Sequence, residues 1–363
     1  MKLKSKFMIN KKELCCILVN LMTVKLFFTY PRNIVINAGN AAWIQTIYVS
    51  LLAVAAYFIT IRVYEKAGMK SILDISEEVG KKPLKIIVGL ILIIIFTANV
   101  TVTMRSFPES VKNTLLPLTP MEVITTMLAA AIAVAAFAGI FSLSRIHSIY
   151  IPFAGIILVI LLIMLTPYMN IVNIAPLFGK GTYNILLSGL EGLSIFSDIL
   201  VLFVLIPFCK SFNEVKKGGG YAVIISAVVS CVLVFFYNMI YANPVAQEFI
   251  FPVYQMTRLI RIGEFFQRLD AFFEFIWSIA MMLYAGVYLY VICYIFKSVF
   301  NLKYTKELII PFVIIISCIS FIPSSIVDLL RSGTILYRIS IPFCILLPVG
   351  LAVLYRIKGH KNV

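Results

Sequence analysis

Apolar stretches follow one another along almost the whole of this chain and are separated by short polar segments. Many of them run for roughly 18 to 25 residues, the length that a helix needs to cross about 30 Å of hydrocarbon. This pattern predicts an all-α polytopic membrane protein that forms one transmembrane domain over residues 1–363. We expect ten transmembrane helices, at about 12–30, 41–61, 84–104, 121–141, 147–167, 185–208, 221–241, 271–296, 308–328 and 339–356.

The composition agrees with a membrane location and excludes a large soluble core. Hydrophobic residues make up 61% of the chain, charged residues only 13%, and the mean hydropathy is +1.02. A soluble domain of this length does not hide so much apolar surface, and typical domains carry about 25% charged residues. The longest polar gap, Glu65–Lys82, leaves no room for an appended catalytic domain.

The net charge of +15 raises the question of a nucleic-acid partner, but the distribution of basic residues excludes one. Lysines and arginines occupy short loops between apolar stretches and form neither a stripe nor a tail. If the amino terminus is cytoplasmic, 21 of the 31 fall in cytoplasmic segments, nine in external segments, and Lys25 inside the membrane. This excess of positive charge on the inner side predicts that both termini are cytoplasmic.

No pattern along the chain is typical of a catalytic or metal centre. The seven cysteines lie in or at the ends of apolar stretches, without CxxC or Cys/His spacing, and are expected to be small buried hydrophobes. His147 and His360 both fall at cytoplasmic helix ends. We therefore expect neither an enzyme nor a bound metal or other cofactor.

Three ionisable residues, Lys25, Glu191 and Asp198, fall within predicted spans. A charge in hydrocarbon is costly, so such residues point to a functional site by default. Lys25 must be neutral, paired with a carboxylate or exposed to a water-filled cavity. The alternative is that the first span begins later and leaves Lys25 at the membrane interface.

Small residues surround the two carboxylates of the sixth span, at Gly189, Gly192, Ser194 and Ser197. Such residues weaken a helix, and an unwound helix is tolerated at membrane depth where it lines a cavity. Close helix packing is the alternative, which explains the glycines and serines but not the two carboxylates.

The third span contributes Asn99, flanked by Thr97, Thr101 and Thr103, either as the wall of a polar cavity or for hydrogen bonds between helices. The first and sixth spans are the polar, interruptible ones, and they lie five spans apart. That spacing is typical of a five-plus-five inverted repeat with a ligand site near the midplane, between the first helices of the two halves.

The external segment 242–270 mixes apolar and charged residues at helical spacing. We expect a short amphipathic helix along the outer face that folds over a vestibule and gates it. A plain interfacial helix with solvated charges is the alternative. The expected gate residues are Arg258, Arg261, Glu264 and Arg268.

Three segments carry distinctive motifs. Residues 26–44 carry a proline-arginine pair before an AG-x-x-AW segment, and residues 196–208 carry an acidic residue followed by a proline. The most specific motif is 251–277, with Arg258, Ile262–Gly263, Arg268 beside Asp270, and Trp277. With these motifs the chain resembles the spore germination receptor B-subunit (GerAB-type) family of the amino-acid/polyamine/organocation transporter superfamily.

The resemblance implies a LeuT-like ten-helix fold and a membrane subunit of a nutrient germinant receptor in the spore inner membrane. It also implies A and C partner subunits and a small-molecule germinant, often an amino acid, held by this subunit. One departure stands out, because related transporters have glycine-rich unwound backbone in the first helix, where this chain has Thr23-Val24-Lys25. Lys25 can supply the missing positive charge, as a substitute for a coupling cation or as a carboxylate partner.

Two functions remain open, because a receptor and a transporter share this fold. The leading one is a germinant-sensing subunit, and the second is a proton- or cation-coupled amino-acid transporter that uses Lys25 with Glu191 or Asp198 as a relay. Aromatic residues at 27, 28, 196 and 284 can shape an apolar part of the pocket. The expected ligand-binding residues are Thr23, Val24, Lys25, Asn99, Gly189, Glu191, Gly192, Ser194, Ser197, Asp198 and Tyr284.

Overall fold

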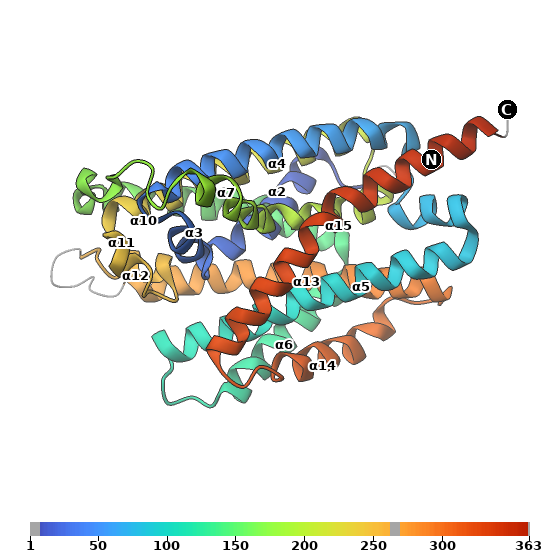
Figure 1. Ribbon diagram of the computed structural model, residues 1–363. Helices are drawn as coiled ribbons and strands as arrows, with labels where there is room; N and C mark the ends of the chain where they lie inside the picture. The colour runs from blue at the N-terminus through green and yellow to red at the C-terminus, as the bar shows by residue number, and fades with distance from the viewer. Residues whose placement is uncertain (1–7, 262–268, 362–363) are drawn as a thin grey trace.

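A computed structural model describes residues 8–261 and 269–361, and these form a bundle of helices joined by short loops (Figure 1). Within these ranges an isolated parallel β-bridge joins Ile9 and Cys209. The main helices are α2 (Lys11–Thr23), α3 (Tyr30–Ala38), α4 (Ala42–Tyr64), α5 (Ile72–Thr114), α6 (Met121–Ala138), α7 (Ile140–Leu165), α10 (Phe212–Ile240), α13 (Leu269–Phe300), α14 (Ile309–Ser320) and α15 (Ile326–Lys361).

Eight helical segments in the described part of the chain are long and apolar enough to cross a membrane. The predicted first and ninth spans also fold as helices, but α2 has 13 residues and α14 has 12, shorter than a full crossing needs. The chain is thus a multi-pass, nearly all-helical membrane protein, as predicted. By length and composition, eight of the described helices can cross a membrane completely.

In the described residues, the first and the sixth helices are interrupted by 3-10 segments, as the polar pattern predicted. After α2 the backbone tightens into a 3-10 turn, η1 (Val24–Phe27), before α3 begins. The sixth segment runs through α8 (Thr182–Leu186), a twelve-residue 3-10 helix η6 (Ser188–Ile199), α9 (Leu200–Leu205) and η7 (Ile206–Phe208). Because 3-10 runs beyond three or four residues are uncommon, the twelve residues of η6 are an unusual interruption of the sixth helix.

Polar contacts join four segments at one end of the bundle. Glu214, at the start of α10, accepts a hydrogen bond at 2.7 Å from the backbone N–H of Lys11, at the start of α2. Lys216 pairs with Glu65 at 3.0 Å, and Lys70 donates to the Tyr355 hydroxyl of α15 at 2.9 Å. The start of α2, the connection from α4 to α5, the start of α10 and the end of α15 therefore lie together, as the predicted cytoplasmic side requires.

Two helices extend beyond the spans that were predicted within them. Helix α15 begins at Ile326, well before the predicted position 339, because hydrogen bonds from Ser324 and Ser325 to Asp328 start the helix despite the charged residues that follow. Helix α5 extends from Ile72 to Thr114 around a break at Gly80 and Lys81, beyond the predicted 84–104. Hydropathy marks the membrane-buried part of a helix and does not mark its end. In Figure 1, α15 crosses α5 obliquely.

The external segment forms two short helices in its described part, α11 (Asn243–Ala246) and α12 (Pro252–Thr257). Helix α12 packs against η1 and α13 and so lies over the outer side of the first interruption. Arg258 and Arg261 follow it and are exposed, whereas Glu264 and Arg268, the other two expected gate residues, lie outside the described residues.

Candidate functional site

A buried ion pair joins the two interrupted helices. Lys25 of η1 places its Nζ 2.8 Å from Oδ2 and 2.9 Å from Oδ1 of Asp198, in η6. Lys25 is 5% exposed and Asp198 is fully buried. Of the three states that the sequence allowed for Lys25, the structure shows pairing with a carboxylate, and the partner is Asp198 rather than Glu191.

A tyrosine from α13 completes this pair. The hydroxyl of Tyr288 donates a hydrogen bond to Oδ1 of Asp198, and the tyrosine is fully buried. The ring centroid of Tyr284, one turn earlier on α13, lies 4.8 Å from that of Tyr288, and the ring centroid of Phe96 of α5 lies 5.4 Å from it. Tyr284 was expected at the site, whereas Tyr288 was not, although residues four apart share a helix face.

The position of Lys25 is set by contacts between η1 and α13. Nε1 of Trp277 donates to the carbonyl of Val24 at 3.4 Å, and the ring of Phe28 packs edge-on against Trp277 at 4.6 Å. These contacts hold both sides of Lys25 in place. The ion pair itself costs desolvation energy that its attraction offsets only with good geometry, so a buried pair is weak support for stability. Such a pair within a membrane span indicates function instead.

Two polar crevices lead away from the pair. One, of about 50 Å³, is lined by Lys25 and by residues of α3, α5, η6 and the outer part of α15. The other, of about 30 Å³, continues between α3, η6 and α15 as far as Glu191 and Arg338. Both have room for water. They are adjacent, because they share Tyr30, Asn33, Ser194 and Thr334.

Glu191 ends this polar path and does not contact Lys25. Its carboxylate pairs with Arg338 of α15 at 2.5 Å, and the two side chains are 34% and 58% exposed. Exposed pairs of this kind contribute about 0–1 kcal/mol to stability. The Glu191–Arg338 pair therefore links η6 to α15 weakly, at the exposed end of the path.

The two glycines of η6 serve close packing, the alternative that the sequence left open. A Cβ on Gly189 meets the side chain of Gln45 at 3.0 Å. A Cβ on Gly192 meets Ile34 of α3 at 3.2 Å, and the Gly192 carbonyl accepts a hydrogen bond from Tyr30 at 3.4 Å. Helices α3 and α4 can approach η6 closely because these positions carry no side chain.

The remaining expected residues lie around the pair in different ways. Ser194 lines both crevices, while Ser197 donates to the Ser194 carbonyl at 2.7 Å. Thr23 donates to the Val19 carbonyl at 2.7 Å and faces a separate apolar cavity. Asn99 is buried on α5 but does not line either crevice. Arg258 and Arg261 are exposed beyond the outer end, outside both crevices.

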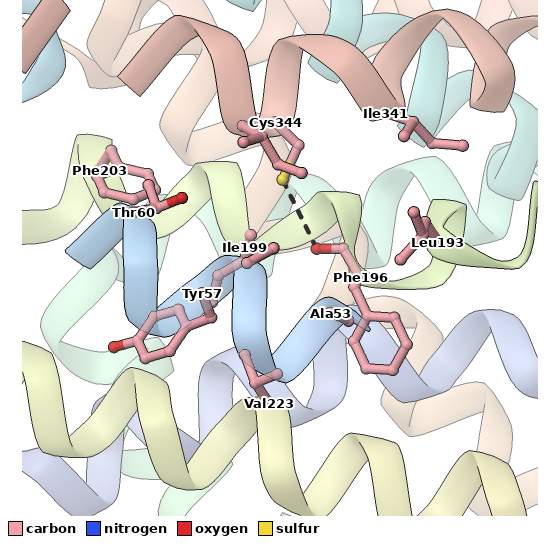
Figure 2. A pocket seen from close by; sticks show the side chains of 12 residues that line it. Ala53, Tyr57, Thr60, Leu193, Phe196, Ile199, Phe203, Val223, Ile341 and Cys344 are labelled. Atoms are coloured by element: carbon pink, nitrogen blue, oxygen red, sulfur yellow. Dashed lines mark hydrogen bonds between the residues drawn. The ribbon is translucent and has the colours of Figure 1, made fainter. Parts of the chain in front are cut away.

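The cavity shown in Figure 2 lies on the other side of η6 and offers little chemistry. It has about 40 Å³ and is enclosed by α4, η6, α10 and α15. Its lining is apolar apart from Tyr57, Thr60 and Cys344, whose Sγ donates to the Phe196 carbonyl at 3.9 Å. Phe196, one of the aromatic residues expected at the site, thus faces this cavity and not Lys25.

Comparisons with known proteins agree with this architecture. A family model described as spore germination protein matches residues 8–328. Spore germination protein B2 of Bacillus subtilis (strain 168) is 21% identical over 260 residues, covering 69% of this chain and 68% of that protein. The putative spore germination protein YfkT of the same organism is 23% identical over 269 residues, covering 73% and 72%.

Two solved structures share the fold. MhsT in complex with L-phenylalanine superposes with a TM-score of 0.67 at 15% identity, over 92% of this chain and 87% of that one. MHP1, a nucleobase-cation-symport-1 family transporter in a closed conformation with bromovinylhydantoin bound, gives 0.54 at 13% identity, over 92% and 78%. At these identities the likeness concerns the fold alone, which is the LeuT-like fold expected from the sequence.

Proposed function

The chain belongs to the spore germination protein family, and from this premise we propose that it is the membrane subunit of a germinant receptor that binds an α-amino acid between η1 and η6. The family is of the permease type and not a family of enzymes. The proposal places the subunit in the spore inner membrane, where it works with A and C subunits.

The observation that carries the proposal is the buried pair of Lys25 and Asp198 between the two interrupted helices. An α-amino acid carries one carboxylate and one ammonium group close together. Its carboxylate can pair with the Lys25 ammonium, and its ammonium can pair with the Asp198 carboxylate. Two ion pairs then replace one. Lys25 and Asp198 are already dehydrated and oriented, so pairing with the amino acid costs them less than it would cost the same groups in water.

Lys25 also explains how the first helix can recognise a carboxylate without glycine. In the LeuT-like arrangement, free backbone N–H groups of broken helices point at anionic groups of the solute. Here the interruption begins directly after Thr23 with Val24 and Lys25, and Lys25 brings a full positive charge instead. The Tyr288 hydroxyl orients the carboxylate of Asp198 for its new partner.

Signalling follows from separation of the pair. The crevices beside Lys25 have room for water but not for an amino acid without rearrangement, so a bound solute has to part η1 from η6. A ligand shifts a conformational equilibrium only by its difference in affinity for the two states. The ligand breaks the Lys25–Asp198 pair and forms two new ion pairs, which supplies this difference in affinity. The separation of η1 from η6 is then transmitted to the A and C subunits.

A coupled amino-acid transporter is the second candidate, favoured by the same buried, ionisable pair within a transporter-type fold. Uptake into liposomes separates the two functions. The probe is whichever radiolabelled amino acid raises the melting temperature of the purified protein most. We expect saturable binding of that amino acid without accumulation inside the vesicles, with or without a proton gradient. Concentrative uptake that a protonophore abolishes would establish transport and refute the pure receptor.

A further inference from the structure

A larger cavity lies on the opposite side of the first helix from the Lys25 crevices. It has about 330 Å³ and is enclosed by α2 with η1, α7, α10 and α13. Along α2 and η1 its lining runs from Cys15 to Phe27, a distance of about 18 Å at the helical rise. The cavity is therefore long and narrow, and neither the ion pair nor the proposed solute uses it.

The polar groups that line this cavity already have partners within the protein. Asn20 donates to the Ala280 carbonyl at 3.0 Å, and Tyr150 donates to the Ile276 carbonyl at 2.5 Å. The Thr23 hydroxyl likewise donates to the Val19 carbonyl, and Nε1 of Trp277 donates to the Val24 carbonyl. A polar guest would find few groups to bind, so the cavity selects an apolar one.

The mouth of the cavity faces the bilayer between α7 and α10. Gly155 of α7 is exposed there, and Ile225 of α10 is 43% exposed. The neighbouring surface of α7 is apolar, with Phe153 54% and Ile156 62% exposed. Large exposed apolar side chains on a membrane-spanning helix face lipid acyl chains. Lipid acyl chains therefore surround the mouth of the cavity.

The size and the apolar lining of the cavity suit an apolar guest. An engineered apolar cavity of about 150 Å³ stays free of water and binds benzene, and this cavity is more than twice as large. We propose that it is a binding site for one acyl chain of a membrane lipid, which enters between α7 and α10. The inserted chain lies along α2 and reaches Trp277, whose indole holds the Val24 carbonyl next to Lys25. It therefore supports the interruption that presents the ion pair.

Tryptophan fluorescence tests this site directly, since the chain contains two tryptophans. Trp43→Phe leaves Trp277, which is 3% exposed and shielded from lipid by the fold. In vesicles of phosphatidylcholine with brominated acyl chains, bromine in contact with the indole quenches its emission. We expect Trp277 emission to fall about two-fold or more relative to unbrominated vesicles, because an apolar chain fills the cavity.

Closing the mouth supplies the decisive comparison. A Cβ at Gly155 meets nothing within 4 Å, so Gly155→Phe, made in the Trp43→Phe background, can fill the mouth without a clash. It is expected to abolish most of the quenching. Gly350→Phe on α15, at an exposed glycine that is equally free of neighbours, is the matched control and should leave quenching unchanged.

The acyl-chain site is refuted if Trp277 is not quenched, or if Gly155→Phe leaves the quenching at its original level. Should Gly155→Phe fail to fold, Ala154→Leu on the same wall provides the second variant, with the same expected recovery of emission. Amino-acid binding is measured on the same samples, so failure of the lipid site and failure of the proposed function are separate results.

Discussion

Lys25→Met is expected to abolish amino-acid binding and to lower the free energy of unfolding by about 3–5 kcal/mol, since it leaves an unpaired charge in the protein interior. Asp198 is fully buried, and methionine offers its carboxylate no counter-charge. Thermal unfolding of the purified protein measures the loss. The matched control is Lys216→Met, which removes a lysine from the exposed pair with Glu65 and should cost less than about 1 kcal/mol.

The double variant Lys25→Met/Asp198→Asn separates stability from function. Replacing a buried ion pair by well-packed hydrophobic residues is often neutral or stabilising, and this double variant likewise leaves no buried charge, so the melting temperature should return close to that of the native protein. Binding should not return, because neither charge of the solute then finds its partner. A double variant that binds the amino acid normally would exclude the pair as the recognition site.

Tyr288→Phe has the second largest expected effect on binding. It keeps the packed ring but removes the hydroxyl that donates to Asp198, and hydrogen bonds to charged groups contribute about 1.5–3 kcal/mol. Affinity for the amino acid should therefore fall by about ten-fold or more, at 1.4 kcal/mol for each factor of ten. The binding isotherm of the purified variant measures this change.

Tyr284→Phe is the control for this substitution, since it alters the neighbouring tyrosine of the same helix face while leaving the bond from Tyr288 to Asp198 intact. We expect a smaller loss of affinity than with Tyr288→Phe. Equal losses for the two variants would show that the hydroxyl of Tyr288 has no particular role in orienting Asp198.

Much of this site could be predicted from the sequence, because charge is so costly in hydrocarbon that Lys25 and Asp198 stand out in any apolar stretch. The choice between Glu191 and Asp198 could not be predicted. They lie in the same twelve-residue 3-10 helix, seven positions apart, or about 14 Å along its axis. Only one of them can meet Lys25, and which one depends on how deep η6 sits beside η1.

Tyr288 and Arg338 could not be identified as site residues from the sequence, because neither stands in a distinctive motif. Tyr288 is one of 18 tyrosines, and a tyrosine inside an apolar span more often packs than binds. Arg338 falls just outside the predicted tenth span, 339–356, yet it lies within α15 and pairs with Glu191. Its place depends on the tilt of α15 across the bundle, which tertiary packing sets and local hydropathy does not.

The most direct test of the central claim is the affinity of the purified protein for three matched compounds. These are the amino acid that binds best, the amine that lacks its carboxylate, and the acid that lacks its ammonium group. If Lys25 and Asp198 each hold one charge, both analogues leave a buried charge unpaired, which costs about 2 kcal/mol or more and weakens binding about 30-fold or more. An amine or an acid that binds as tightly as the amino acid would contradict recognition by the Lys25–Asp198 pair.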